Sequence, residues 1–139
     1  MSARPGHRGK LSEAAILVQE FHRAAGHPGR MDRTMLRVLR SKLILEEAQE
    51  ASDAISDAKL TSFGRVDYLR PMIKQHVAKE LADLLVVTYG AADVFSIPLD
   101  AVLREVHASN MTKDFSGPRR EDGKVMKGET YRRPDLSWV

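Results

Sequence analysis

Two short acidic clusters are the residues of this sequence whose types and spacing suit chemistry. Glu47 and Glu50 stand three positions apart, as do Glu80 and Asp83, so each pair projects from one face if its segment is helical. Large apolar residues stand beside both pairs, which predicts that some of these carboxylates border a core. These neighbours are Leu43, Ile44, Leu81 and Leu84. Like charges gathered between two helices repel, so the pattern calls for a compensating cation.

Magnesium is the cation that this donor set favours, with Mn²⁺ as a substitute. Mg²⁺ prefers hard oxygen ligands and completes its shell with waters and substrate phosphate oxygens, whereas Ca²⁺ takes more ligands. A di-iron site in a helical bundle calls for Glu-x-x-His motifs, and neither Glu47 nor Glu80 has a histidine three residues later. A single pair of this kind is usually a solvated helix face. Two pairs on successive helices favour a metal site.

Helical spacing of apolar residues predicts the elements that position these carboxylates. The predicted helices cover residues 12–25, 34–59, 72–95 and 98–113. Ser12 is the expected N-cap of the first, and Pro98 suits the first turn of the fourth. The expected buried face of the first helix consists of Ala15, Leu17, Val18 and Phe21. Segment 61–71 has little periodicity and predicts a loop. Four helices with short connections predict an all-α fold, a four-helix bundle.

The character of the chain changes after Asp114. Five glycines and prolines interrupt residues 114–139 and exclude a long helix there. They are Gly117, Pro118, Gly123, Gly128 and Pro134. We expect an irregular basic tail, either an ordered flap or a mobile arm. The 139 residues, 42% of them apolar, predict a single domain whose core helices span about 12–113.

The composition favours a cytoplasmic protein that binds cations and an anionic substrate. The net charge of +3 combines basic ends with an acidic centre: residues 1–42 carry nine Lys or Arg and three Asp or Glu, whereas residues 43–112 carry six and eleven. Such a layout suits cations in an acidic pocket with basic groups holding an anionic substrate. There are no cysteines, which suits the cytoplasm. No membrane span, signal peptide or nucleic-acid-binding motif is recognisable, so we expect neither membrane nor nucleic acid as a partner.

The acidic pattern resembles a known superfamily. Glu46-Glu47-x-x-Glu50 followed by Glu80-x-x-Asp83 is similar to the signature of the MazG-like all-α NTP pyrophosphohydrolases, which include the dimeric dUTPases. The resemblance covers most of the chain, and the tail places it nearest to the small stand-alone members. The segment between the clusters, 61–74, is longer than in the shortest members. Further matching runs are Gln19–His22, Ala82–Gly90, Glu105–Lys113 and Asp122–Gly128.

The resemblance implies a homo-oligomer of four-helix protomers, with a dimer favoured. It implies that Glu47, Glu50, Glu80 and Asp83 bind Mg²⁺ and that Glu46 ligates the metal or orders a water. Water would attack the α-phosphorus of a nucleoside triphosphate and pyrophosphate would leave. We expect Glu47 to orient or deprotonate that water, with Glu46 as the other candidate.

Substrate-binding residues follow from the same resemblance. Asn110 and Lys113, at the end of the fourth helix, are expected to bind a sugar hydroxyl and a phosphate, and His22 to reach the nucleotide from the first helix. In the tail, Tyr131 or Trp138 would stack on a base. The tail cations expected to close over the triphosphate are Arg119, Lys124 and Lys127. The tail and fourth-helix pattern make dUTP the leading substrate candidate.

Three alternatives stay open at this point. The chain could be a non-catalytic helical interaction module that has kept the bundle without the activity. It could be an enzyme of the same fold that acts on phosphoribosyl-ATP. Nucleic-acid binding by the basic ends would show an affinity that falls steeply with salt and does not depend on Mg²⁺.

Overall fold

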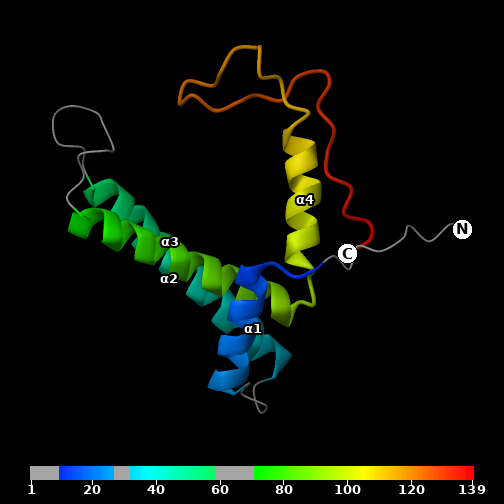
Figure 1. The fold of residues 1–139 in the computed structure, drawn as a ribbon. Coiled ribbons are helices and arrows are strands. Elements are labelled where there is room, and N and C mark those ends of the chain that lie inside the picture. Colours follow the sequence, from blue (N-terminus) through cyan, green and yellow to red (C-terminus); the bar gives the residue numbers. More distant parts are fainter. Residues whose placement is uncertain (1–9, 27–31, 59–70) are drawn as a thin grey trace, which may run out of the picture. The chain divides into compact units, whose positions relative to one another are not determined.

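The chain folds into four α-helices in a computed structural model that describes residues 10–26, 32–58 and 71–139 (Figure 1). These residues contain no strand, and an isolated antiparallel bridge joins Asp114 to Met126. The all-α prediction is therefore confirmed, while the predicted loop 61–71 lies outside the described residues except for Pro71. The helices are α1 (Glu13–Ala25), α2 (Arg33–Asp57), α3 (Pro71–Val94) and α4 (Leu99–Asn110).

The chain divides into two compact units. The first, Glu13–Ser96, contains α1, α2 and α3 and carries both acidic clusters. The second consists of Ile97–Val139 together with the described residues 10–12, and it contains α4 and the tail. Within this second unit, Ser12 donates hydrogen bonds from its backbone N–H and its hydroxyl to Asp100, both at 2.8 Å.

The second helix, α2, begins at a strong capping residue. Asp32 has an extended backbone, and its carboxylate accepts a hydrogen bond of 2.8 Å from the N–H of Met35. No Gly or Pro interrupts the following 25 residues, so the helix runs unbroken to Asp57. Glu47 therefore lies in the regular middle part of this helix.

Removal of this cap should destabilise the protein without altering the acidic cluster. We expect Asp32→Ala to lower the free energy of unfolding by about 1 kcal/mol, because the N–H of Met35 loses its acceptor. Urea unfolding followed by far-UV circular dichroism measures the change. Asp32→Asn keeps an acceptor and is the matched control. An Ala variant as stable as the Asn variant would show that this hydrogen bond contributes nothing.

The packing of α2 against α3 forms the body of the first unit, and Figure 1 shows the two helices side by side. Both helices bury small side chains: Ala51 and Ala54 of α2 and Ala92 of α3. The pairing of the two helices places Glu47 of α2 near Glu80 and Asp83 of α3.

The first helix, α1, packs against α3 with a different face from the predicted one. Ala15 and Val18 are buried as expected, but Leu17 and Phe21 are more than half exposed, and His22 is buried instead. The cause lies in α3, where Gly90 has no side chain and leaves room for the His22 ring. The expected apolar face of α1 was therefore wrong at two of its four positions.

The fourth helix, α4, is shorter at both ends than predicted. Pro98 lies just before the first helical residue, and the helix stops at Asn110 rather than near Lys113. Its end is tightened by the N–H of Lys113, which donates to the carbonyl of Asn110 at 3.1 Å. Such three-residue bonds end a helix in a tight turn. Asn110 and Lys113 thus stand on either side of the helix terminus.

The tail is ordered by hydrogen bonds to α4 and the turn after it. The hydroxyl of buried Ser109 donates to the carbonyl of Arg132 at 2.6 Å, and the N–H of Arg132 donates to the Thr112 hydroxyl at 2.8 Å. Further along, the N–H of Asp135 donates to Glu105 at 2.9 Å. These bonds return the last residues along α4, as Figure 1 shows.

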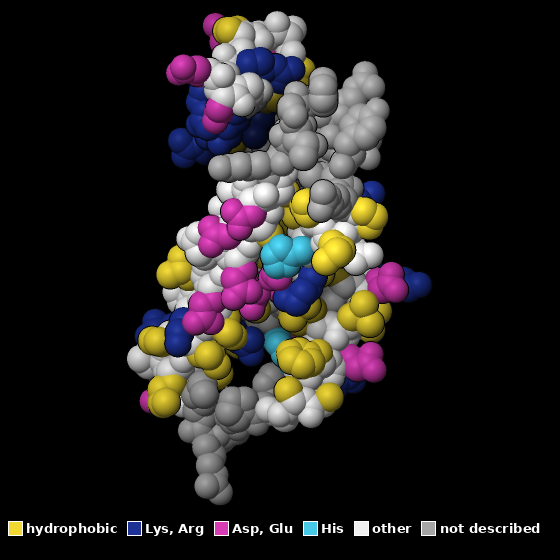
Figure 2. Space-filling view, turned by 90° about the vertical axis from the view of Figure 1, so that its left-hand side faces the viewer, with side chains coloured by type: hydrophobic (Ala, Val, Ile, Leu, Met, Phe, Trp, Pro, Cys, Tyr) yellow, Lys and Arg dark blue, Asp and Glu magenta, His cyan; other side chains and the backbone are white. Residues whose placement is uncertain are grey.

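Much apolar surface is exposed on the first unit. Leu45 of α2 is 71% exposed, Leu81 and Leu85 of α3 are each nearly half exposed, and none of the larger side chains among residues 10–26, 32–58 and 71–139 is fully buried. Figure 2 shows apolar side chains spread around the acidic ones on one face.

Among the described helices, no single one is both long and apolar enough to cross a membrane; α3 and α4 reach that criterion only when taken as an interrupted pair.

Candidate metal centre

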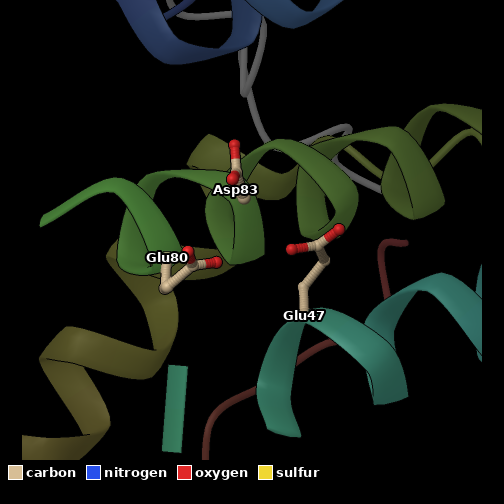
Figure 3. Close-up of side chains that lie close together, drawn as sticks. All are labelled: Glu47, Glu80 and Asp83. Carbon is tan, nitrogen blue, oxygen red and sulfur yellow. The ribbon is translucent and has the colours of Figure 1, made fainter. Parts of the chain in front are cut away.

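Three carboxylates meet where α2 faces α3. Glu47 reaches from α2 toward Glu80 and Asp83 of α3 (Figure 3), and one oxygen from each lies within 4.8 Å of the other two. Glu80 is buried, with 4% of its surface exposed, while Glu47 and Asp83 are half-buried. Two residues one helical turn apart on α3 and one on α2 therefore form a converging acidic group.

One oxygen of Glu80 differs from the other oxygens of the cluster in its surroundings. Its Oε2 atom is buried and accepts no hydrogen bond from the described residues. A buried carboxylate oxygen without a partner costs free energy, because it has lost the water that would solvate it. A divalent cation would satisfy this oxygen and relieve the repulsion among the three carboxylates. The cluster is therefore suited to hold a metal ion.

Basic side chains of α3 neutralise part of this negative charge. The Lys79 ammonium lies 2.7 Å from Asp83 Oδ2 and 3.0 Å from Glu80 Oε1. These hydrogen bonds, that to Asp83 first, raise the pKa of Lys79 above its usual value. His76 Nδ1 lies 3.3 Å from the same Oε1 of Glu80. Both basic groups thus contact Oε1 of Glu80 rather than Oε2.

The protonation of Glu47 is altered by its surroundings. Desolvation by burial is the largest cause that raises its carboxyl pKa above 4.5, and the negative charges of Glu50, Asp83 and Glu80 add to the rise. The Lys79 ammonium opposes it. A carboxylate whose pKa lies nearer to neutrality is a stronger base, which suits a group that takes a proton from water.

The other two predicted ligands lie outside the converging group. Glu50 is exposed, yet close enough that its charge acts on Glu47. Glu46 is exposed as well, and its Oε1 lies 3.6 Å from Lys42 Nζ one turn earlier on α2. The structure therefore brings together three of the five predicted carboxylates and places Glu46 beside a lysine.

His22, the substrate candidate of α1, is a buried residue at the contact with α3. Its Nδ1 lies 3.7 Å from Asp93 Oδ2, and its ring stands 5.7 Å from that of Phe21. Beside it lies an open pocket of about 350 Å³ that is also lined by Gln19, Arg23 and Val94. His22 is therefore a buried residue of α1 that lines this pocket.

The remaining substrate candidates belong to the second unit. The Lys127 ammonium lies 4.7 Å from the centroid of the Tyr131 ring, a cation–π contact. The hydrogen bond with Ser109 is the first cause that lowers the pKa of the Tyr131 hydroxyl, followed by the charges of Lys127, Lys113 and Arg133. A positive field thus surrounds Tyr131. Asn110, Arg119 and Lys124 are exposed.

The tail is anchored at its start by Asp114. The Asp114 Oδ1 atom accepts hydrogen bonds from the N–H and hydroxyl of Ser116 and the N–H of Gly117, at 2.8 to 3.0 Å. These bonds, that from the Ser116 hydroxyl first, lower the pKa of the Asp114 carboxyl below 3.8. Gly117 and Gly128 both lie against Asp114, where an added Cβ would come within 2.3 and 2.7 Å of it. The turn thus requires glycine at both positions.

Loss of the Asp114 acceptor should loosen this turn. We expect Asp114→Ala to speed amide hydrogen exchange at Ser116 and Gly117 by about tenfold at neutral pH. Because the folded pKa is lowered, the contribution of the carboxylate is full above pH 3.8 and is lost as the pH falls through the folded value. Asp114→Asn, which keeps an acceptor, should exchange more slowly than the Ala variant. Equal exchange in all three proteins would contradict this role.

Sequence reasoning missed the basic partners of the cluster. Lys79 and Asp83 are four residues apart, as are His76 and Glu80, and pairs at this spacing are neighbours on a helix. That signal was present in the sequence. The approach of His22 and Arg40 to Gly90 had no comparable signal, because it depends on how three helices pack.

The comparison with protein families agrees with this geometry. The profile described as phosphoribosyl-ATP pyrophosphohydrolase matches residues 18–110, about two thirds of the chain, and this span includes all three converging carboxylates. No curated protein matches the chain significantly. The chain belongs to the phosphoribosyl-ATP pyrophosphohydrolase family of the MazG-like all-α superfamily, and so to the pyrophosphohydrolases that act on nucleotide phosphoanhydrides.

Proposed function

We propose that the protein is a Mg²⁺-dependent pyrophosphohydrolase that splits the α–β phosphoanhydride of a nucleoside triphosphate group, leaving a monophosphate and pyrophosphate. The observation that carries this proposal is the convergence of Glu47, Glu80 and Asp83, together with a buried Glu80 Oε2 that has no hydrogen-bond partner among the described residues. Three carboxylates with one unsatisfied oxygen match the hard-ligand preference of Mg²⁺. When bound, the ion would supply positive charge that stabilises the charged phosphate oxygens.

The protein residues have separate roles in this proposal. Glu47 of α2 and Glu80 and Asp83 of α3 would hold the metal, with Glu50 as a further ligand from α2. Glu47 would also orient the attacking water and accept its proton, because its carboxylate reaches from α2 toward the two carboxylates of α3. Glu46 is the second candidate for that water. In the second unit, Lys113 and Lys127 are proposed phosphate-binding residues, because they contribute positive charge around Tyr131.

Two substrates are proposed in a definite order. Phosphoribosyl-ATP comes first because the matching family carries that description. The sequence by itself is also compatible with an enzyme of this fold that acts on phosphoribosyl-ATP. The deoxynucleotide dUTP comes second. It is favoured by the ordered basic tail, which lies beyond residue 110 and so outside the family match. Both substrates contain the same triphosphate group and release the same pyrophosphate.

The exposed apolar residues support the proposal that two protomers pair. Leu45, Val38 and Ile55 of α2 are each more than half exposed, as is Met72 of α3. A second copy would cover such surface. We expect light scattering coupled to gel filtration to give twice the mass of 15.6 kDa. The mass of a single chain would contradict pairing.

The test of the proposed function is pyrophosphate release from a panel containing phosphoribosyl-ATP, dUTP and the common NTPs and dNTPs. The wild type is assayed with and without Mg²⁺, beside Asp83→Asn. Asp53→Asn is the control, because Asp53 is an exposed acid of α2 whose carboxylate accepts a hydrogen bond from Gln49. We expect Mg²⁺-dependent release that only Asp83→Asn abolishes. No turnover on any nucleotide would favour the non-catalytic interaction module instead.

A further inference from the structure

The Lys79 ammonium occupies the edge of the acidic cluster. Its Nζ lies 2.7 Å from Asp83 Oδ2 and 3.0 Å from Glu80 Oε1, so it bridges two of the three converging carboxylates. The Lys79 side chain is 64% exposed, whereas that of Glu80 is 5% exposed. A cation carried on an exposed, flexible stem thus reaches one of the most buried charged groups of the first unit.

This ammonium satisfies the cluster only in part. The buried Oε2 of Glu80 still has no hydrogen-bond partner among the described residues. Among these residues, the ammonium forms ion pairs with Glu80 and Asp83 but not with Glu47, the third converging carboxylate. A single positive charge on two of three carboxylates leaves net negative charge behind. A divalent ion would neutralise more of it, and the exposed Lys79 side chain can turn into solvent at little cost.

We propose that Lys79 is an internal cation that competes with the divalent metal ion for Asp83 and Glu80 and thereby weakens metal binding. The inference rests on the proposed metal centre. In the metal-free protein the lysine limits repulsion among the carboxylates. When the metal concentration rises, the ammonium is displaced, so the lysine sets the concentration at which the site fills.

An opposite role for Lys79 makes the opposite prediction. If the lysine instead held Asp83 and Glu80 in position for the metal, its removal would disorder the ligands and weaken binding. Competition predicts tighter binding once the charge is removed. The direction of the change in metal affinity therefore decides between the two.

The experiment measures Mn²⁺ and Mg²⁺ binding to the full-length chain by isothermal titration calorimetry, without nucleotide. The variants are Lys79→Gln, which removes the charge, and Lys79→Arg, which keeps it. Lys42→Gln is the matched control, because Lys42 is an exposed α2 lysine that pairs with Glu46 in the same i, i+4 manner. Thermal unfolding of each metal-free protein gives a second readout.

We expect Lys79→Gln to bind the metal about five- to tenfold more tightly, since the two charge pairs that compete with the metal, to Asp83 and to buried Glu80, are lost. Its metal-free melting temperature should fall, because the carboxylates then repel without relief. Lys79→Arg and Lys42→Gln should bind within about twofold of the wild type. Unchanged or weaker binding by Lys79→Gln would overturn the competition. If neither the wild type nor Lys79→Gln binds metal, the proposed metal centre itself fails.

Discussion

Replacement of Glu47 by glutamine should abolish pyrophosphohydrolase activity and stabilise the metal-free protein. We expect kcat/KM for pyrophosphate release to fall by at least about 100-fold, because the site loses a carboxylate that faces Glu80 and Asp83. The melting temperature without metal should rise by a few degrees, since the neutral amide no longer repels its neighbours. Activity and thermal unfolding of one preparation give both readouts.

The stability gain of this variant should depend on pH in a defined direction. The folded state raises the pKa of Glu47 above 4.5, so between 4.5 and the folded value it binds more protons than the unfolded state. The free energy of unfolding of the wild type therefore falls as the pH rises through this window. Glu47→Gln has no titrating carboxyl at this position, so it does not lose stability in this window. The difference in the free energy of unfolding between variant and wild type should be absent below pH 4.5 and reach its full size above the folded pKa. Asp53→Asn is the control, and an advantage that does not change with pH would contradict the repulsion.

The neighbouring Glu46 provides a comparison that decides which glutamate acts on water. Glu46 pairs with Lys42 and lies outside the converging group. If Glu47 is the base, Glu46→Gln should keep most of kcat. A large loss of kcat in Glu46→Gln with unchanged metal affinity would assign the water to Glu46 instead. Calorimetric metal binding beside steady-state kinetics separates the two cases.

The second large effect is expected at Gly90, where three helices meet. A Cβ added here would lie 2.7 Å from the Cε1 of His22 and 3.0 Å from an Nη1 of Arg40. His22 is buried at the contact with α3, so moving its ring aside would disturb that packing. We expect Gly90→Val to lower the free energy of unfolding by about 2 kcal/mol through overpacking. Urea denaturation measures the loss.

A graded variant tests the physical cause of this loss. Gly90→Ala should be less damaging than Gly90→Val, because alanine regains about 1 kcal/mol of helix propensity and adds only one methyl group. In the double variant with His22→Ala, the cost of Gly90→Val should shrink, since the clashing ring is gone. An undiminished cost in the double variant would show that His22 is not the obstacle.

The limits of sequence reasoning appear most clearly on α1. Periodicity predicted its bounds to within one residue, because its helical pattern ends at a clear glycine signal. It failed on the buried face, where His22 replaced Leu17 and Phe21. A glycine on another helix made that exchange favourable, and no local pattern on α1 contains that information.

The acidic site shows the same division between sequence and structure. Residue type and spacing alone determined that these acidic residues could project from helix faces: Glu47, Glu50, Glu80 and Asp83. The resemblance to a superfamily then predicted that they bind Mg²⁺. Only the packing of α2 on α3 decided that Glu47 converges with the two α3 residues while Glu46 turns toward Lys42. Helical periodicity is local and can be read from sequence. The rotation of one helix against another depends on the side-chain contacts between them, which the spacing along a single helix does not determine.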